Sequence, residues 1–149
     1  MANFRMIYDN AADRASLAVS SSASASLGVA NLTTDIKSQV WRTSAATTGV
    51  ITATWTVAEI VGGVMLPFTN LGSGATIRVQ AYTNVADASP IYDSGAQLAC
   101  AAVPLGLLAW GSDLLGVNSY SYGGMAYGRW WFTEQKDVKK LVITVGDVT

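Results

Sequence analysis

Aromatic side chains late in the chain are the residues whose type and spacing best suit recognition chemistry. Most of them alternate with Gly and Ser in the stretch "NSYSYGGMAYGRWWF", residues 118–132. Rigid rings with a polar edge can stack on sugar rings or fill a pocket on a partner protein. The candidate interface or ligand residues are Trp110, Tyr120, Tyr122, Tyr127, Trp130 and Trp131. On a strand, Trp130 and Trp131 point to opposite faces, so we expect one in the core and the other facing solvent, a subunit or a ligand.

The sequence contains few of the residue types that enzymes use for catalysis. The chain has no His, which removes the usual general base, the usual activator of a Ser or Cys nucleophile and a common metal ligand. Hydrolysis by a pair of carboxylates stays formally open, but the spacing singles out no pair among Glu59, Asp87, Asp93, Asp113, Glu134 and Asp137. We therefore expect a protein that is not an enzyme and that holds no cofactor and no catalytic metal.

A glycine-rich pentad at residues 70–74 looks at first like a phosphate-binding loop. Such a loop needs a helix directly after it, with Lys and Ser or Thr beside the last glycine. Here Gly72 and Gly74 lead into the alternating "ATIRVQAY" of residues 75–82. We therefore expect a five-residue hairpin loop in which the glycines supply the turn.

Charge and hydropathy exclude two classes of partner. The 9 basic and 10 acidic residues are scattered, so no basic patch for nucleic acid can form. The longest apolar stretch, residues 98–110, is broken by Pro104 and Gly106 and is shorter than the roughly 18 residues of a spanning helix. The N-terminal residues carry charges of both signs and do not form a secretion signal. We expect a soluble protein of the cytoplasm, with no membrane insertion.

The elements that must position these residues are strands. In "VITATWTV", residues 50–57, the alternation places Ile51, Ala53, Trp55 and Val57 on one face. The Gly pair and Pro67 in "IVGGVMLPF" favour a buried strand with a bulge over a helix. Further strands are expected at 75–82, 91–95, 129–134 and 139–145, and the Ser-rich residues 14–29 are expected to be extended or strand.

This pattern predicts the fold class. Several short strands separated by Gly, Asn, Asp and Ser clusters are typical of an all-β sandwich or jelly roll. A length of 149 residues, half of them apolar, fits one domain with a single core. We therefore predict a single antiparallel β-sandwich domain over residues 1–149.

The residues also resemble a known family. "NLTTDIKSQVWRT", residues 31–43 with the pair Trp41-Arg42, is similar to the early part of discoidin-like, galactose-binding-like jelly rolls. "FTNLGSGATIRVQAY", "PIYDSG" and "KKLVITVGD", which ends in Asp147, look like the version of that domain in tailed-phage virion proteins. The resemblance covers most of residues 31–147.

The resemblance implies a non-enzymatic structural subunit of a bacteriophage tail, baseplate or tail tip. Such a subunit assembles in the host cytoplasm and packs in the virion against copies of itself and other virion proteins. Domains of this kind usually close with one more strand. Its absence here predicts an open edge, with the final strand missing or supplied by another chain.

A carbohydrate-binding module for host-surface glycan is the alternative, although the loop residues of the sugar-binding members are not matched here position by position. Discoidin-like folds sometimes hold a structural Ca²⁺, for which Asp35 is the nearby carboxylate. One carboxylate is too few to predict a site.

Overall fold

Strands make up most of the part of the chain that the structure describes. The computed structural model describes residues 9–34, 36, 38–45, 47–69, 71, 75–99 and 126–146. The strands in these ranges are β1 (Ser16–Val19), β2 (Thr48–Thr69), β3 (Thr76–Tyr82), β4 (Tyr92–Asp93), β5 (Gln97–Leu98) and β6 (Ala126–Gly146). They are accompanied by short 3-10 helices, η1 (Ala11–Arg14), η2 (Ala25–Leu27) and η3 (Val29–Thr33). No helix within the described ranges has the length and apolar character to cross a membrane.

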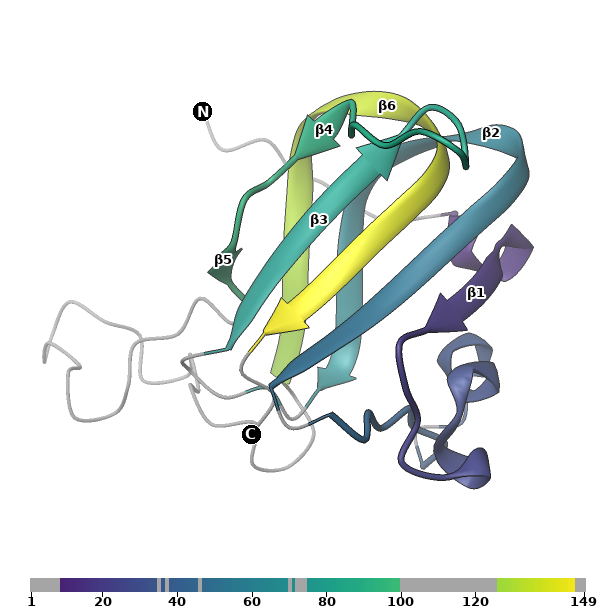
Figure 1. The fold of residues 1–149 in the computed structure, drawn as a ribbon, viewed down its shortest axis with the longest axis vertical. Coiled ribbons are helices and arrows are strands. Elements are labelled where there is room, and N and C mark those ends of the chain that lie inside the picture. Colours follow the sequence, from purple (N-terminus) through teal and green to yellow (C-terminus); the bar gives the residue numbers. More distant parts are fainter. Residues whose placement is uncertain are drawn as a thin grey trace, which may run out of the picture.

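The strands form one hydrogen-bonded sheet that is folded over into two layers. All pairs are antiparallel and the order is β1-β2-β6-β3-β4, with β5 also paired to β3. β2 and β6 are 22 and 21 residues long, and Figure 1 shows both arching over at one end and returning behind the other strands. The front layer therefore holds β1, the first half of β2, the second half of β6, β3 and β4. The other halves of β2 and β6 form the back layer.

The fold-over lies where the register between β2 and β6 breaks. Thr54 pairs with Lys140, and pairing resumes at Glu59 with Val138, so four residues of β2 lie opposite a single residue of β6. Extra residues in one strand of a pair bend that strand and increase its twist. Val57 belongs to this bulged stretch and is 74% exposed. The expectation that Val57 shares a face with Ile51, Ala53 and Trp55, which are buried, is therefore wrong, because the alternation ends where the strand bends.

The core lies between the two layers. Ile77 and Val79 of β3 and Val138 of β6 are fully buried, and Phe132 of β6 is 2% exposed. Complete burial of one such side chain contributes about 1.5–3 kcal/mol to folding. The same strands carry polar side chains that point outward. The alternation of apolar and polar residues in the sequence therefore corresponds to the inner and outer faces of the sandwich.

The structure confirms the predicted all-β, single-domain antiparallel sandwich. The strand expected at residues 75–82 is β3, and its Ile77, Val79 and Ala81 are buried as predicted. The two strands expected at 129–134 and 139–145 are parts of the single strand β6.

The hairpin expected at residues 70–74 is wrong, because β2 and β3 are not neighbours in the sheet. β6 lies between them in the strand order. Thr69 at the end of β2 pairs with Ala126, whereas Thr76 at the start of β3 pairs with Gly146. The chain therefore passes from the back layer to the front layer between Thr69 and Thr76. Gly72 and Gly74 lie outside the described residues.

The second half of β6, residues 140–146, pairs with β2 on one side and with β3 on the other, so no open edge lies beside this half. The first half of β6, residues 126–138, pairs with β2 alone among the described residues, so this half forms an edge of the described back layer. The described front layer ends at β1 and, on the opposite side, at β4 and β5. Whether a further strand completes the domain stays a prediction.

The Ser-rich segment is partly a strand, as expected, and partly helical. Leu17 and Val19 of β1 pack against the core, while η2 and η3 follow as single 3-10 turns. Trp41, which carries part of the family resemblance, also packs against the core, and its Nε1 donates a hydrogen bond to the carbonyl oxygen of Ser21 at 2.9 Å. Its role is therefore structural.

Candidate functional site

An open pocket of about 470 Å³ lies near the end of the sandwich where β2 bends. One wall comes from η1 and the start of β1, with Asp13, Arg14, Ala15 and Ser16. Ser16 is in register with Thr54 of β2, and the Thr54 hydroxyl donates to the Ser16 carbonyl oxygen at 3.3 Å. The wall is therefore fixed to the sheet by strand pairing.

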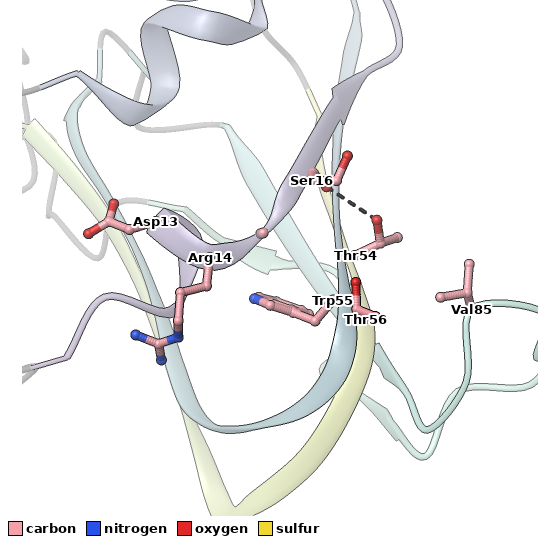
Figure 2. A pocket seen from close by; sticks show the side chains of 8 residues that line it. Asp13, Arg14, Ser16, Thr54, Trp55, Thr56 and Val85 are labelled. Carbon is pink, nitrogen blue, oxygen red and sulfur yellow. Dashed lines mark hydrogen bonds between the residues drawn. The ribbon is translucent and has the colours of Figure 1, made fainter.

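The other walls of the pocket come from β2 and from the loop after β3. Thr54, Trp55 and Thr56 line it from β2, and Val85 lines it from the loop. Figure 2 shows Thr54 and Thr56 on the same side of β2 as Val85, with Trp55 turned to the opposite side, towards Arg14. The ring of Trp55 is only 6% exposed, so Trp55 supports the pocket from the core.

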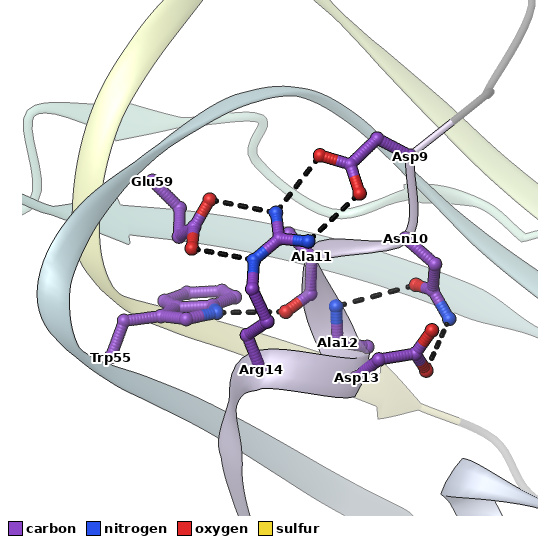
Figure 3. Close-up of polar contacts among 8 residues, drawn as sticks. All are labelled: Asp9, Asn10, Ala11, Ala12, Asp13, Arg14, Trp55 and Glu59. Carbon is purple, nitrogen blue, oxygen red and sulfur yellow. Dashed lines mark hydrogen bonds and ion pairs between the residues drawn. The ribbon is translucent and has the colours of Figure 1, made fainter.

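A charge-paired clasp holds η1 against the bend of β2 (Figure 3). Arg14 Nε and Nη2 donate to the two carboxylate oxygens of Glu59 at 2.8 and 2.9 Å. Arg14 Nη1 and Nη2 donate to the two carboxylate oxygens of Asp9 at 2.8 and 2.9 Å. These hydrogen bonds lower the pKa of both carboxyl groups and raise the pKa of Arg14. All three groups therefore stay charged around neutral pH.

Two further hydrogen bonds fix η1. Trp55 Nε1 donates to the carbonyl oxygen of Ala11 at 2.9 Å, which joins the helix to the core strand. Asn10 caps the helix, because its side-chain oxygen accepts from the backbone N–H of Ala12 at 3.3 Å and its amide nitrogen donates to Asp13 Oδ1 at 2.8 Å. The Asp13 side chain is thereby oriented at the pocket wall.

Lys140 fixes the wall that carries Val85. Its Nζ donates to the carbonyl oxygens of Val85 and Asp87 at 2.8 and 2.9 Å and lies 4.0 Å above the centre of the Tyr82 ring. The carboxylate of Asp87 accepts from the backbone N–H of Asn84 at 2.8 Å. The loop is therefore held from β6 and by its own side chain.

Hydroxyl groups are the free polar groups of this pocket. Among the described residues, the hydroxyls of Ser16 and Thr56 have no hydrogen-bond partner. The same part of the chain contains no group of three Asp, Glu, Cys or His side chains that could hold a metal. The pocket can therefore bind a small polar group through hydroxyls and a carboxylate, and nothing in its walls resembles a nucleophile paired with a base.

Of the aromatic candidates, only Trp130 and Trp131 have described side chains, and neither is among the described residues that line this pocket. Trp110, Tyr120 and Tyr122 lie outside the described residues, and so does the side chain of Tyr127 in β6. Trp130 is half-buried against the core, and its Nε1 donates to the hydroxyl oxygen of Tyr92 at 2.6 Å. The expectation that one of the adjacent tryptophans fills the core therefore fits Trp130.

Trp131 lies on the other side of β6, where it is half-buried over its cross-strand partner Gly63. A Cβ atom at Gly63 would stand 2.6 Å from Trp131 Cε3 and 2.8 Å from the carbonyl oxygen of Trp130. The absence of a side chain at Gly63 thus lets the ring lie on the strand. The role of Trp130 and Trp131 as interface or ligand residues stays a prediction.

Three of the acidic residues considered for hydrolysis, Glu59, Asp93 and Glu134, each have a separate basic partner. Glu59 binds Arg14, and Glu134 Oε2 accepts from Lys136 at 3.0 Å. Asp93 accepts from Arg78 and from Gln80, and the hydrogen bonds from Arg78 are the main cause that holds its pKa far below the usual range. Asp113 and the calcium candidate Asp35 lie outside the described residues. None of the described bonds joins two of these acids into a catalytic pair.

Sequence reasoning missed the pocket because its described walls come from three separate segments of the chain. The one available signal was the alternation of residues 50–57, which puts Thr54 and Thr56 on the face opposite to Ile51, Ala53 and Trp55. Arg14 and Glu59 are 45 positions apart, and neither carries a local motif that predicts their contact.

Comparisons with known proteins identify a fold and no family. No protein-family profile matches the sequence, and no curated protein matches it. The structure is similar to chitosan-binding module 1 from a chitosanase/glucanase of Paenibacillus sp. IK-5, with a TM-score of 0.55, 13% identity, and 93% of this chain and 87% of that chain covered. A selenomethionine-labelled mutant of that module matches with a TM-score of 0.55, 14% identity, and coverage of 92% and 85%. At this identity the likeness shows a shared β-sandwich fold.

Proposed function

We propose that this chain is a non-enzymatic carbohydrate-binding module. The carrying observation is the backbone likeness, which extends over 93% of this chain and 87% of a chitosan-binding module. That protein is a binding module of a larger enzyme, which agrees with the lack of a paired acid or nucleophile among the described residues. Function does not follow from fold alone, so the proposal needs a binding experiment.

The pocket supports the proposal through its chemistry. Its free hydroxyls at Ser16 and Thr56 and the carboxylate of Asp13 can exchange hydrogen bonds with sugar hydroxyls. Val85 adds an apolar surface. The walls are held by strand pairing, by the Arg14 clasp and by Lys140, so a ligand meets a site that is already ordered and loses less entropy on binding.

A glycan array with the full chain tests the function. We expect binding above background to at least one class of glycan, and competition by the same saccharide free in solution. The same chain unfolded by heat is the control for adsorption. Absence of binding to every glycan on the array and to insoluble polysaccharides would overturn the proposal.

A structural subunit of a phage particle is the second candidate, and exposed apolar side chains on β2 favour it. Val57, Ile60 and Met65 are 74%, 66% and 46% exposed. Large exposed apolar groups along one element are typical of a surface that contacts another protein. We expect the chain to self-associate in light scattering, and we expect the double variant Val57→Lys, Ile60→Lys to be monomeric. A native chain that stays monomeric at high concentration argues against this role.

A further inference from the structure

Residues 9–14, which we call the strap, are joined to one another by their own side chains. Arg14 donates two hydrogen bonds to the carboxylate of Asp9, at 2.8 and 2.9 Å. The side chain of Asn10 bonds the first turn of η1, both at a backbone N–H and at a carboxylate. All these bonds lie within the strap, so a movement of the strap as one unit would keep them.

Among the described residues, three hydrogen bonds tie the strap to the sheet (Figure 3). Two run from Arg14 to the carboxylate of Glu59, and the third runs from Trp55 Nε1 to the carbonyl oxygen of Ala11. Ala11 also packs against the core, but no residue of η1 is buried, and the Arg14 side chain is 46% exposed. Few buried contacts and solvent-exposed bonds are typical of segments that open while the rest of a domain stays folded.

Ala15 is the point about which the strap can turn. It follows η1 directly and has an extended backbone, with φ −87° and ψ 149°. The next residue, Ser16, begins β1 and is fixed to the sheet by its pairing with Thr54. A rotation at Ala15 therefore lifts the strap and leaves β1 in place.

Trp55 lies beneath the strap. Figure 3 shows its ring pointing from β2 towards η1, with the N–H directed at Ala11. The ring is buried while the strap is in place, and its N–H is bonded to the Ala11 carbonyl oxygen. Lifting the strap uncovers an aromatic face together with a hydrogen-bond donor, and this combination suits a ligand that has an apolar face and a polar edge.

We propose that residues 9–14 form a hinged strap that opens over Trp55 while the sandwich stays folded. In the closed state Trp55 belongs to the core, and in the open state it adds an aromatic surface at the pocket that it lines. The ion pair between Arg14 and Glu59 breaks on opening, whereas the ion pair between Arg14 and Asp9 moves with the strap. This device does not depend on the proposed carbohydrate-binding function.

Hydrogen exchange of the Trp55 indole N–H, followed by NMR on the full chain, measures the opening. The Trp55 signal is identified as the indole signal that is lost in Trp55→Phe. After correction for intrinsic rates, we expect this N–H to exchange at least about ten-fold faster than the backbone amides of the core strands β3 and β6. Low concentrations of urea should accelerate the core amides but not the Trp55 N–H, because opening of the strap exposes little surface.

Two variants that remove the same charge separate the bonds across the hinge from the bonds within the strap. Glu59→Gln removes a charge that holds the strap to the sheet, so it should raise the opening constant about 1.5- to 5-fold, the range for an exposed ion pair. Asp9→Asn is the matched control, because it removes a charge that moves with the strap. It should leave the opening constant unchanged or lower it, since Arg14 is then left to Glu59 alone.

The outcomes decide between local opening and global unfolding. Fast exchange of the Trp55 N–H that is insensitive to low urea and is raised by Glu59→Gln but not by Asp9→Asn supports the strap. Exchange with the rate and urea dependence of the core amides shows that only global unfolding uncovers Trp55, and it overturns the proposal. Equal acceleration by the two variants also overturns it. Core amides measured in the same samples show whether a variant has changed the stability of the whole sandwich.

Discussion

The adjacent glycines of β2 offer a sharp test of how the back layer is packed. A Cβ at Gly63 would stand 2.6 Å from Trp131 Cε3 and 2.8 Å from the backbone oxygen of Trp130. The backbone oxygen can move only if β6 moves, so Gly63→Ala must displace a strand. A Cβ at Gly62 would meet only the Cγ of the Gln135 side chain at 3.3 Å, and this long side chain can turn away.

The expected magnitudes follow from these contacts. Forcing an extra methyl group into a packed site costs about 1–3 kcal/mol, and replacing Gly by Ala returns about 0.4–1 kcal/mol by restricting the unfolded chain. We therefore expect Gly63→Ala to lower the free energy of unfolding by about 1–2 kcal/mol. Gly62→Ala, the matched control, should leave it unchanged or raise it by about 0.5 kcal/mol. For a chain of this length, the midpoints of thermal unfolding of the two variants should differ by about 4–8 °C.

Urea unfolding followed by circular dichroism measures both variants. The slope of the free energy against urea should be the same for native chain and variants, which shows that the same surface is exposed on unfolding. If Gly63→Ala is as stable as Gly62→Ala, then Trp131 does not lie on Gly63, and the described packing of β2 against β6 is wrong.

Three further perturbations test the clasp, the pocket wall and the polar cluster of β3. Trp55→Phe keeps a buried ring but loses the hydrogen bond to the Ala11 carbonyl oxygen. We therefore expect urea unfolding to show a free energy of unfolding that is lower by about 1 kcal/mol. An unchanged free energy would show that this hydrogen bond does not hold η1. Lys140→Met keeps the apolar stem but loses the hydrogen bonds to the loop after β3. Amide hydrogen exchange at residues 83–90 should therefore become faster, and Lys140→Arg should exchange at a rate closer to that of the native chain. Equal exchange rates in all three chains would show that Lys140 does not hold this loop. Because Arg78 holds the pKa of Asp93 far below its usual range, the stabilisation by Asp93 is present above the ordinary carboxyl pKa of about 3.9 and is lost as pH falls towards the folded-state value. The stability difference between the native chain and Asp93→Asn should therefore be larger at pH 7 than at pH 2.5, and a constant difference refutes the assignment.

Alternation along single strands was predictable from the sequence, because it is a local property of a pleated backbone. Ile77 and Val79 show this most clearly. The fold-over of β2 was not predictable, since it depends on register shifts against β6, whose residues are about 80 positions away. The stretch "QKDV" of residues 135–138 lies between the two strands that were expected, but its backbone pairs with β2 and continues β6.

The candidate site shows the same difference between local properties, which the sequence reveals, and long-range contacts, which it does not. Chemical types can be judged from the sequence, and the lack of His is the observation that directed the search towards binding and away from nucleophile and metal chemistry. The location of a pocket depends on which segments meet in space. Asp13, Thr56 and Val85 belong to three such segments, and no spacing along the chain relates them.

The central place of β6 also determines when this protein can fold during synthesis. β2 and β3 both take β6 as their partner, and they do not pair with each other. While the ribosome is still making the chain before residue 126, the described strands can form only β1 with β2 and β3 with β4 and β5. The apolar faces of β2 and β3 therefore stay without their main partner until β6 has emerged from the ribosome. Strand pairing over such long sequence separations is slow. A nascent chain stalled just before residue 126 should be sensitive to protease and should recruit chaperones, and release of β6 should close both layers in one step.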